Sequence, residues 1–210
     1  MDIKQAWKLL SYDSIPTRLS SYSLEEERNQ DENYYLLRYN DALWEFCFVT
    51  CEKNSTGITE VLKTFKDEEA SSKYFYLFLL SKAYFNRYIF PFEEHNKDIN
   101  IGETNCSVEN LKEAFKRLKI GSQYYSFNQV KKKHSIYLKY VGHGESSVQF
   151  IGENKKIIFE TPIMENWLSY YAMYKFVYYL YLLDERVKTL QIKKKVDIKF
   201  TDEDYNVFML

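Results

Sequence analysis

Two long aromatic stretches constrain the fold of this chain more than any other feature of its sequence. Residues 167–183 are almost entirely apolar or tyrosine, interrupted by Ser169 and Lys175, and residues 74–90 repeat this pattern with polar interruptions of their own. A membrane-spanning helix needs about 20 mostly apolar residues. The interruptions and the tyrosine hydroxyls therefore favour buried helices of a soluble protein, with a helix lying at a membrane interface as the alternative. We expect no membrane partner.

The aromatic content is high throughout, with 20 Tyr, 15 Phe and 3 Trp, whereas Gly and Pro number only 6 and 3. This composition argues against a disordered or low-complexity chain. The tyrosines can fill a core with their hydroxyls reaching water or a carbonyl, or they can form a binding face. The core is favoured because most of them lie among apolar residues in expected helices and strands.

The expected elements follow the same order in both halves of the chain. In the first half they are a helix at 3–10, strands at 34–38, 43–50 and 58–65, and a helix at 67–85. In the second half they are a helix at 108–118, strands at 135–141, 148–151 and 156–160, and a helix at 163–186. Residues 188–200 add one or two further strands through the alternation of Val196, Ile198 and Phe200.

This order predicts an α+β fold of two similar halves, each an antiparallel three-stranded sheet flanked by helices. We place the modules at 1–100 and 101–210, joined by the polar connector 91–104, and they can pack as one globular unit. The repetition indicates a degenerate duplication. The alternative is chance, since any unit of a helix, three strands and a helix looks like another at this level of detail.

Short motifs between residues 15 and 76 stand in a distinctive order. They are Ile15-Pro16, Tyr22-Ser23-Leu24, a strand from Trp44 to Cys51, Phe65 with Glu68 and Ala70, and the helical Tyr74-Phe75-Tyr76. Their order resembles a family of small bacterial immunity proteins, the antidotes of polymorphic and contact-dependent toxins. The resemblance covers about a third of the chain. It departs from the family after the strand, where Glu52-Lys53-Asn54 stands in place of Glu-Arg-Gly.

The resemblance implies an antitoxin that works in bacterial competition and contact-dependent growth inhibition. Such a protein binds a cognate toxin domain, in some cases a basic nuclease, and occludes its active site without turnover. We therefore expect no enzyme activity, no catalytic residues and no cofactor. The first residues lack a basic segment followed by an apolar run, so a cytoplasmic location is expected. The sequence leaves the oligomeric state open.

Charge is distributed unevenly along the chain. Residues 1–70 hold 14 acidic and 8 basic side chains, whereas residues 101–210 hold 13 acidic and 17 basic ones. The acidic stretch contains Glu25, Glu26, Glu27, Asp31 and Glu32. It can be a solvated loop or a docking surface for a basic toxin, because complementary charge speeds association and selects partners. We take these five residues as the candidate toxin-binding site.

Four residues of the motif region are assigned structural roles: Trp44, Glu45, Arg38 and Phe65. Trp44 alternates with two phenylalanines on one face of its strand and covers the core. Glu45 falls on the opposite face, where a carboxylate needs a partner, and Arg38 across the hairpin is the natural one.

Two other classes of function have weaker support in the sequence. The runs Lys131-Lys132-Lys133 and Lys193-Lys194-Lys195 can follow a phosphate backbone and make a nucleic-acid-binding accessory or regulatory protein the alternative function. Solvated lysines explain both runs more simply, so nucleic acid is the less favoured partner. His143 lies between two glycines and is the one candidate for a catalytic residue, although a hairpin turn is the simpler explanation of this Gly-His-Gly sequence. The three cysteines and three histidines lack metal-ligand spacing, so no metal site is expected.

Overall fold

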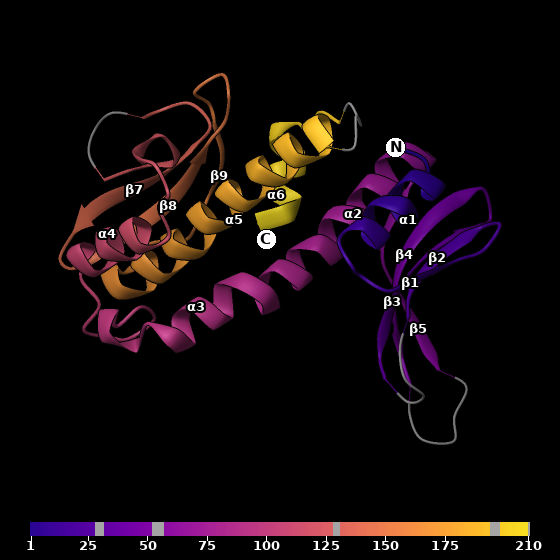
Figure 1. The fold of residues 1–210 in the computed structure, drawn as a ribbon, viewed down its shortest axis with the longest axis horizontal. Coiled ribbons are helices and arrows are strands. Elements are labelled where there is room, and N and C mark those ends of the chain that lie inside the picture. The colour runs from indigo at the N-terminus through magenta and orange to yellow at the C-terminus, as the bar shows by residue number, and fades with distance from the viewer. Residues whose placement is uncertain (28–31, 52–56, 128–130, 194–197, 210) are drawn as a thin grey trace. The chain divides into compact units, whose positions relative to one another are not determined.

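The computed structural model describes residues 1–27, 32–51, 57–127, 131–193 and 198–209 (Figure 1). Helices and two largely antiparallel sheets make up the chain, so the α+β class is confirmed. The chain divides into two compact units, Met1–Ala83 and Tyr84–Leu210, here called the N-terminal and C-terminal units. This division falls near the end of a long helix, whereas the sequence placed the boundary at the polar connector.

The N-terminal unit begins with a helix, continues through five strands and ends in a second helix. Its elements are α1 (Ile3–Tyr12), β1 (Thr17–Leu19), β2 (Ser23–Glu26), β3 (Tyr34–Asn40), β4 (Leu43–Thr50), β5 (Ile58–Phe65) and α2 (Glu68–Tyr84). The strands form one antiparallel sheet in the order β1-β2-β3-β4-β5. The expected sheet of three strands was wrong for this half because β1 and β2 extend it on one side.

A short turn joins β3 to β4 and sets their register. Asp41 and Ala42 both adopt positive φ angles, 47° and 65°, and the flanking residues Asn40 and Leu43 are paired. A two-residue turn of this kind twists in the same sense as the strands it joins. The register places Trp44 opposite Tyr39 and continues to the far end of both strands.

The core of the N-terminal unit forms where α2 packs on the middle of the sheet. Phe46 on β4 is 1% exposed, and its ring lies 5.0–6.1 Å from the ring centroids of Tyr74, Phe75 and Phe78 on α2. All three contacts have the edge-on geometry that aromatic pairs prefer. As expected from the sequence, Trp44 is buried and Phe46 shares its face of the strand.

The C-terminal unit contains the remaining elements. They are a π-helical turn (Phe85–Ile89), α3 (Phe90–His95), a 3-10 turn (Lys97–Ile99), α4 (Val108–Arg117), a second 3-10 turn (Ser122–Tyr124), β6 (Tyr125–Ser126), β7 (Ser135–Gly142), β8 (Glu145–Ile151), β9 (Ile157–Glu160), β10 (Met164–Glu165), α5 (Asn166–Lys193) and α6 (Asp202–Met209). β8 pairs with β7 on one side and with β9 and β10 on the other, and β6 runs parallel to β7. This sheet therefore also has five strands instead of three.

The 28-residue helix α5 packs on β7 and β8 and contacts α6. It continues to Lys193, so the strands expected within 188–200 are absent from the described part of that segment. Leu183 and Leu190 are both fully buried. A spacing of seven residues places them on the same face of a helix, which explains why the helix extends through this segment.

The two units share a structural repeat, as the order of elements in the sequence indicated. Asp2 and Ser107 each form a capping box at the start of α1 and α4. Both helices end in the same way, because Ile15 and Ile120 each donate a backbone hydrogen bond of 2.9 Å to the carbonyl five residues earlier. A residue with positive φ precedes each isoleucine, which completes a Schellman motif.

The repeat extends into the sheets. Pairing to the next strand shifts directly after Phe46 in the first sheet and directly after Phe150 in the second. Both phenylalanines lie on the middle strand of a three-stranded meander that precedes a long helix. The units differ at their edges, where β1 and β2 are antiparallel and β6 is parallel to its neighbour. These shared details support the duplication.

Replacing Phe46 by alanine should lower the free energy of unfolding by about 3–5 kcal/mol, because it empties a site surrounded by aromatic rings. Denaturant titration of the purified variant measures this change. Phe90→Ala is the matched control: this ring is 47% exposed, so the loss should stay below about 1 kcal/mol. Equal losses in the two variants would contradict the assignment of the core.

Candidate functional site

The edge strand β5 is the part of the N-terminal unit most open to a partner. Seven of its eight residues are exposed, and the side chains of Ile58, Val61 and Leu62 are exposed by 66%, 43% and 47%. The strand pairs with β4 on one side, and the sheet order ends with it. An unpaired strand edge presents backbone donors and acceptors that can pair with another chain.

The register shows how the side chains of β5 are distributed. Lys63 lies opposite Phe46 and Phe65 lies opposite Trp44, so both belong to the face that α2 covers. Val61 lies opposite Cys47, on the other face. Nζ of Lys63 lies 4.4 Å from the ring centroid of Tyr74, which holds this lysine against α2. The strand therefore exposes apolar side chains together with two charged ones, Glu60 and Lys63.

Two exposed aromatic rings lie across the sheet from the Phe65 end of the strand, beyond the buried Trp44. Tyr39, the residue paired with Trp44, is 45% exposed, and its ring stacks obliquely on Trp44 with 5.3 Å between centroids. Tyr22 is 68% exposed and lies 6.4 Å from Tyr39. Partly exposed tyrosines next to apolar residues are typical of protein interfaces. We call β5 together with Tyr22 and Tyr39 the edge surface.

The five acidic residues of the candidate toxin-binding site do not form one uniform loop. Glu25 and Glu26 lie on strand β2, where Glu25 pairs with Arg18 at 3.5 Å and Glu26 pairs with Lys82 at 3.0 Å. Glu27 follows the strand and is exposed. Glu32 is exposed, with a partner of its own. Asp31 lies outside the described residues.

The residues assigned structural roles lie on neighbouring strands. Arg38 and Glu45 are paired across the hairpin, and Nε of Arg38 donates a 2.8 Å hydrogen bond to Oε2 of Glu45. Asn40 donates a second bond to the same carboxylate. Both bonds favour the ionised form and lower the pKa of Glu45. The ion pair expected from the sequence is therefore present.

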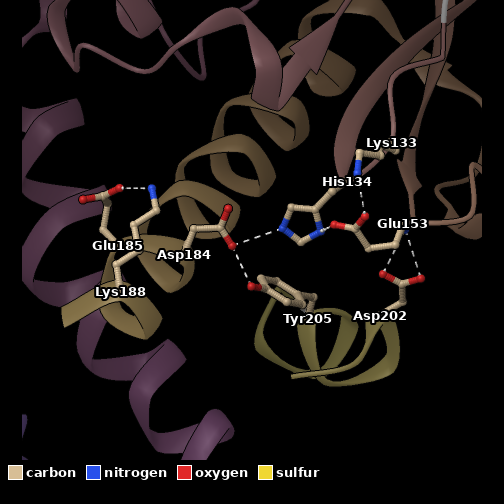
Figure 2. A network of polar contacts seen from close by, with 8 residues as sticks. All are labelled: Lys133, His134, Glu153, Asp184, Glu185, Lys188, Asp202 and Tyr205. Atoms are coloured by element: carbon tan, nitrogen blue, oxygen red, sulfur yellow. Dashed lines mark hydrogen bonds and ion pairs between the residues drawn. The ribbon is translucent and has the colours of Figure 1, made fainter. Parts of the chain in front are cut away.

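A buried polar network in the C-terminal unit was not predicted from the sequence. Figure 2 shows Asp184 of α5 between the His134 ring and the hydroxyl of Tyr205. Nε2 of His134 lies 3.1 Å from Oδ1 of Asp184, and Tyr205 donates a 2.6 Å hydrogen bond to the same oxygen. Tyr124 also bonds to this carboxylate. The network joins the start of β7 to α5, α6 and the 3-10 turn before β6.

A second carboxylate lies on the other side of the histidine ring. Nδ1 of His134 is 3.8 Å from Oε1 of Glu153, and the backbone N–H of Glu153 lies 3.3 Å from both oxygens of Asp202 (Figure 2). Gly152 is required in this arrangement, because a Cβ there would collide with the Asp202 carboxylate. His134 itself has a φ of 49°, a conformation that few non-glycine residues adopt.

The surroundings of His134 favour its charged form. Burial lowers its pKa, but the hydrogen bond and charge of Asp184, together with Glu153 and Asp202, outweigh burial and raise that pKa above its ordinary value. Burial raises the pKa of Asp184, and hydrogen bonds from His134, Tyr205 and Tyr124 lower it by more, below the usual range. A general base needs a ring nitrogen free to face a substrate. Here Nε2 bonds to Asp184, and the buried Nδ1 faces Glu153 across 3.8 Å without a hydrogen-bond partner among the described residues, so the network is suited to joining elements.

The remaining candidate groups lie apart from this network. Lys132 contacts the backbone carbonyls of Ser122 and Tyr125, and Lys133 pairs with Glu153 at 3.3 Å, so two of the three lysines in the first run are engaged within the chain. Most of the second run lies outside the described residues. His143 is exposed in the β7–β8 turn between two glycines with positive φ.

Comparisons with protein-family models, with curated proteins and with solved structures gave no match. The resemblance to immunity proteins therefore rests on the short motifs of residues 15–76 alone. Within the described part of the chain, no helix is long and apolar enough to cross a membrane. The same residues contain no group of three or more His, Cys, Asp or Glu side chains placed to hold a metal ion.

The network predicts a pH dependence of stability. A histidine whose pKa is raised on folding stabilises the fold fully below its unfolded pKa, and this contribution is lost as the pH rises through the folded pKa. We expect the free energy of unfolding to fall above pH about 6.5, by at most about 1.4 kcal/mol per pH unit for one proton. In His134→Gln this slope should become shallower and keep only the contribution of Glu93, whose pKa is also raised on folding, while His143→Asn in the exposed turn should retain the full slope. Denaturant titrations between pH 6 and 8 would contradict this account if His134→Gln kept the full slope.

Proposed function

We propose that this protein is a bacterial antitoxin that binds a toxin domain through the edge surface. The observation that carries the proposal is the exposure of β5, an eight-residue edge strand with three large apolar side chains in solvent. Native proteins protect sheet edges with short strands, outward charges or covering segments. β5 carries two such charges, Glu60 and Lys63, but its length and its three exposed apolar side chains still suit it to a partner that supplies a strand.

The composition of the surface suits recognition of another protein. β5 contributes the apolar side chains of Ile58, Val61 and Leu62, and Tyr39 and Tyr22 add two exposed rings on the far side of β4. Aromatic residues at the centre of an interface contribute much of the binding energy, and backbone pairing along the strand fixes the register. An interface of ordinary size buries about 1,600 Å² in total, so the partner must also contact elements beyond β5.

Electrostatic attraction between this chain and a basic toxin also supports the proposal. Residues 1–70 carry a net charge of −6, which would attract a basic toxin such as a nuclease. Because Glu25 and Glu26 are already paired within the chain, Glu27 is the freer of the described acidic residues at this site. The lysine contacts within the C-terminal unit make the nucleic-acid alternative less attractive, since Lys132 and Lys133 are engaged.

The edge surface is tested by substitutions that keep the fold. Ile58→Asp and Leu62→Asp place charges on side chains that are already exposed, so stability should change little. Each should weaken toxin binding at least tenfold, equivalent to about 1.4 kcal/mol, measured by calorimetry. Ile192→Asp is the control, because its 77% exposed side chain lies outside the edge surface.

The toxin for this experiment is the variable C-terminal domain of a large secreted protein that we expect to be encoded directly upstream. Co-expression of the chain should relieve the toxicity of that domain, and the two should co-purify. A chain that neither binds nor protects against this domain would contradict the antitoxin proposal. Unchanged affinity in both β5 variants would instead exclude the edge surface and leave the antitoxin function standing.

The charge contribution is tested at Glu27. Reversal to lysine in Glu27→Lys should slow association with a basic toxin, because it weakens long-range attraction, and should make the rate less sensitive to salt. Stopped-flow association at two ionic strengths measures both effects. Glu113→Lys on α4 is the control for total charge. If both reversals slow association equally, only the net charge matters and the acidic site is excluded.

A further inference from the structure

A pocket of about 700 Å³ opens in the C-terminal unit between the loop after α3 and the first turns of α5. Trp167, Leu168 and Tyr171 of α5 form one wall, and residues 100–105 form the other. The indole N–H of Trp167 donates a 2.8 Å hydrogen bond to Oε2 of Glu165, which fixes the ring. The volume is sufficient for a small organic group or a long side chain.

The loop wall is held in place by residues suited to unusual backbone angles. Asn100 ends the 3-10 turn in the left-handed conformation, with φ of 50°, and Gly102 has φ of 85°. A Cβ at Gly102 would lie 3.5 Å from the ring of Tyr171, so this backbone passes directly over the aromatic wall. Asparagine and glycine adopt these angles more readily than other residues, which explains their positions.

The pocket also contains a carboxyl group with unused bonding capacity. Oε2 of Glu93 accepts a 3.3 Å hydrogen bond from the hydroxyl of Tyr171, whereas the buried Oε1 has no hydrogen-bond partner among the described residues. Burial raises the pKa of Glu93 to about 7, although the Tyr171 hydroxyl and the charge of Lys175 lower it in part. Because Oε1 is shielded from solvent, a ligand in the pocket would interact with this group through its charge.

Negative charge dominates the lining. Glu93, Glu94 and Glu103 face a single cation, Lys97, which already pairs with Glu94 at 3.2 Å. The chain places one ammonium group beside the aromatic wall itself, since Nζ of Lys175 lies 4.7 Å from the ring centroid of Tyr171. Carboxylates around an aromatic wall form the chemical environment in which proteins bind ammonium ligands.

We propose that this pocket binds an aliphatic ammonium group, carried by a small amine or by a lysine side chain of another protein. The ammonium group would lie against the indole of Trp167 and be attracted by the negative charges of Glu93 and Glu103. An anionic ligand would be repelled by Glu103 and by the ionised form of Glu93, and a neutral apolar one would gain nothing from either charge. The pocket lies in the C-terminal unit and β5 in the N-terminal unit, so this site and the proposed edge surface can each fail without the other.

Binding of a cation should be linked to the ionisation of Glu93. The charged or titratable groups around it are Glu94 on its own helix, Tyr171, Tyr174 and Lys175 on α5, and Lys97 and Glu103 on the pocket wall. Because an ammonium ligand favours the carboxylate, affinity should rise with pH through about 7. For a single linked proton the gain between pH 6 and pH 8 is up to about tenfold.

The test follows the indole N–H signals of the three tryptophans by ¹⁵N NMR, with the signal of residue 167 assigned from Trp167→Phe. N-acetyl-lysine methylamide and n-butylammonium are the probes, and N-acetyl-norleucine methylamide is the neutral control. Both cations should shift the Trp167 signal saturably, with dissociation constants on the order of 1 mM for ligands of this size, and leave the Trp7 and Trp44 signals in place. Tighter binding of the lysine amide would identify a protein side chain as the source, and equal or tighter binding of butylammonium would identify a free amine.

Two variants separate the role of the carboxyl group from general charge. Glu93→Gln should weaken binding about tenfold at pH 8 and remove its pH dependence, whereas Glu60→Gln on β5 should change neither. The proposal is overturned if the cations give no saturable shift, if the norleucine amide binds as tightly as the lysine amide, or if Glu93→Gln retains the pH dependence.

Discussion

The fold depends on the burial of one aromatic residue in the middle strand of the three-stranded meander in each unit. Phe46 packs on three rings of α2, and Phe150 packs between Phe159 of β9 and Tyr205 of α6. In both sheets the pairing shifts directly after this residue. A β-bulge at the same position bends the strand and increases its twist, which lets a flat ladder curve towards the elements that cover it. In each unit the first helix, the meander and the second helix are therefore arranged around one buried phenylalanine.

This constraint also explains why β5 is left open. α2 covers the face of the N-terminal sheet that carries Phe46, and β5 follows β4 at the end of the strand order. Its side chains Ile58, Val61 and Leu62 lie beyond the aromatic contacts that α2 makes with Phe46 and remain exposed. The corresponding strand of the C-terminal sheet, β9, instead contacts α6. The edge surface thus results from the absence of a counterpart to α6 among the described elements of the N-terminal unit.

The sequence predicted elements where local chemistry determines structure. The strand carrying Trp44 and Phe46 alternates regularly, and the capped helices begin at Asp2 and Ser107 with polar side chains suited to that position. Strands β1 and β2 were missed because a serine-rich segment around Ser20 lacks apolar alternation and is held mainly by pairing with β3.

Long-range contacts account for the other differences. The helix expected to start at Ile163 begins at Asn166, because Thr161 still bonds to the backbone of Val148 and the chain then pairs once more with β8. The network at His134 could not be predicted from the sequence, because the residues that contact His134 lie 50 and 71 positions further along the chain. The pocket at Trp167 likewise depends on a loop and a helix that are distant in sequence.

Amide hydrogen exchange of β5 with and without the toxin domain tests the central claim most directly, because it reports backbone pairing at each residue. An edge strand exposes alternate N–H groups to water, and a partner strand would cover them. We predict slower exchange across Ile58–Phe65 on binding, with little change in β1 at the opposite edge of the sheet. Protection confined to other elements, with β5 unchanged in the complex, would contradict the account.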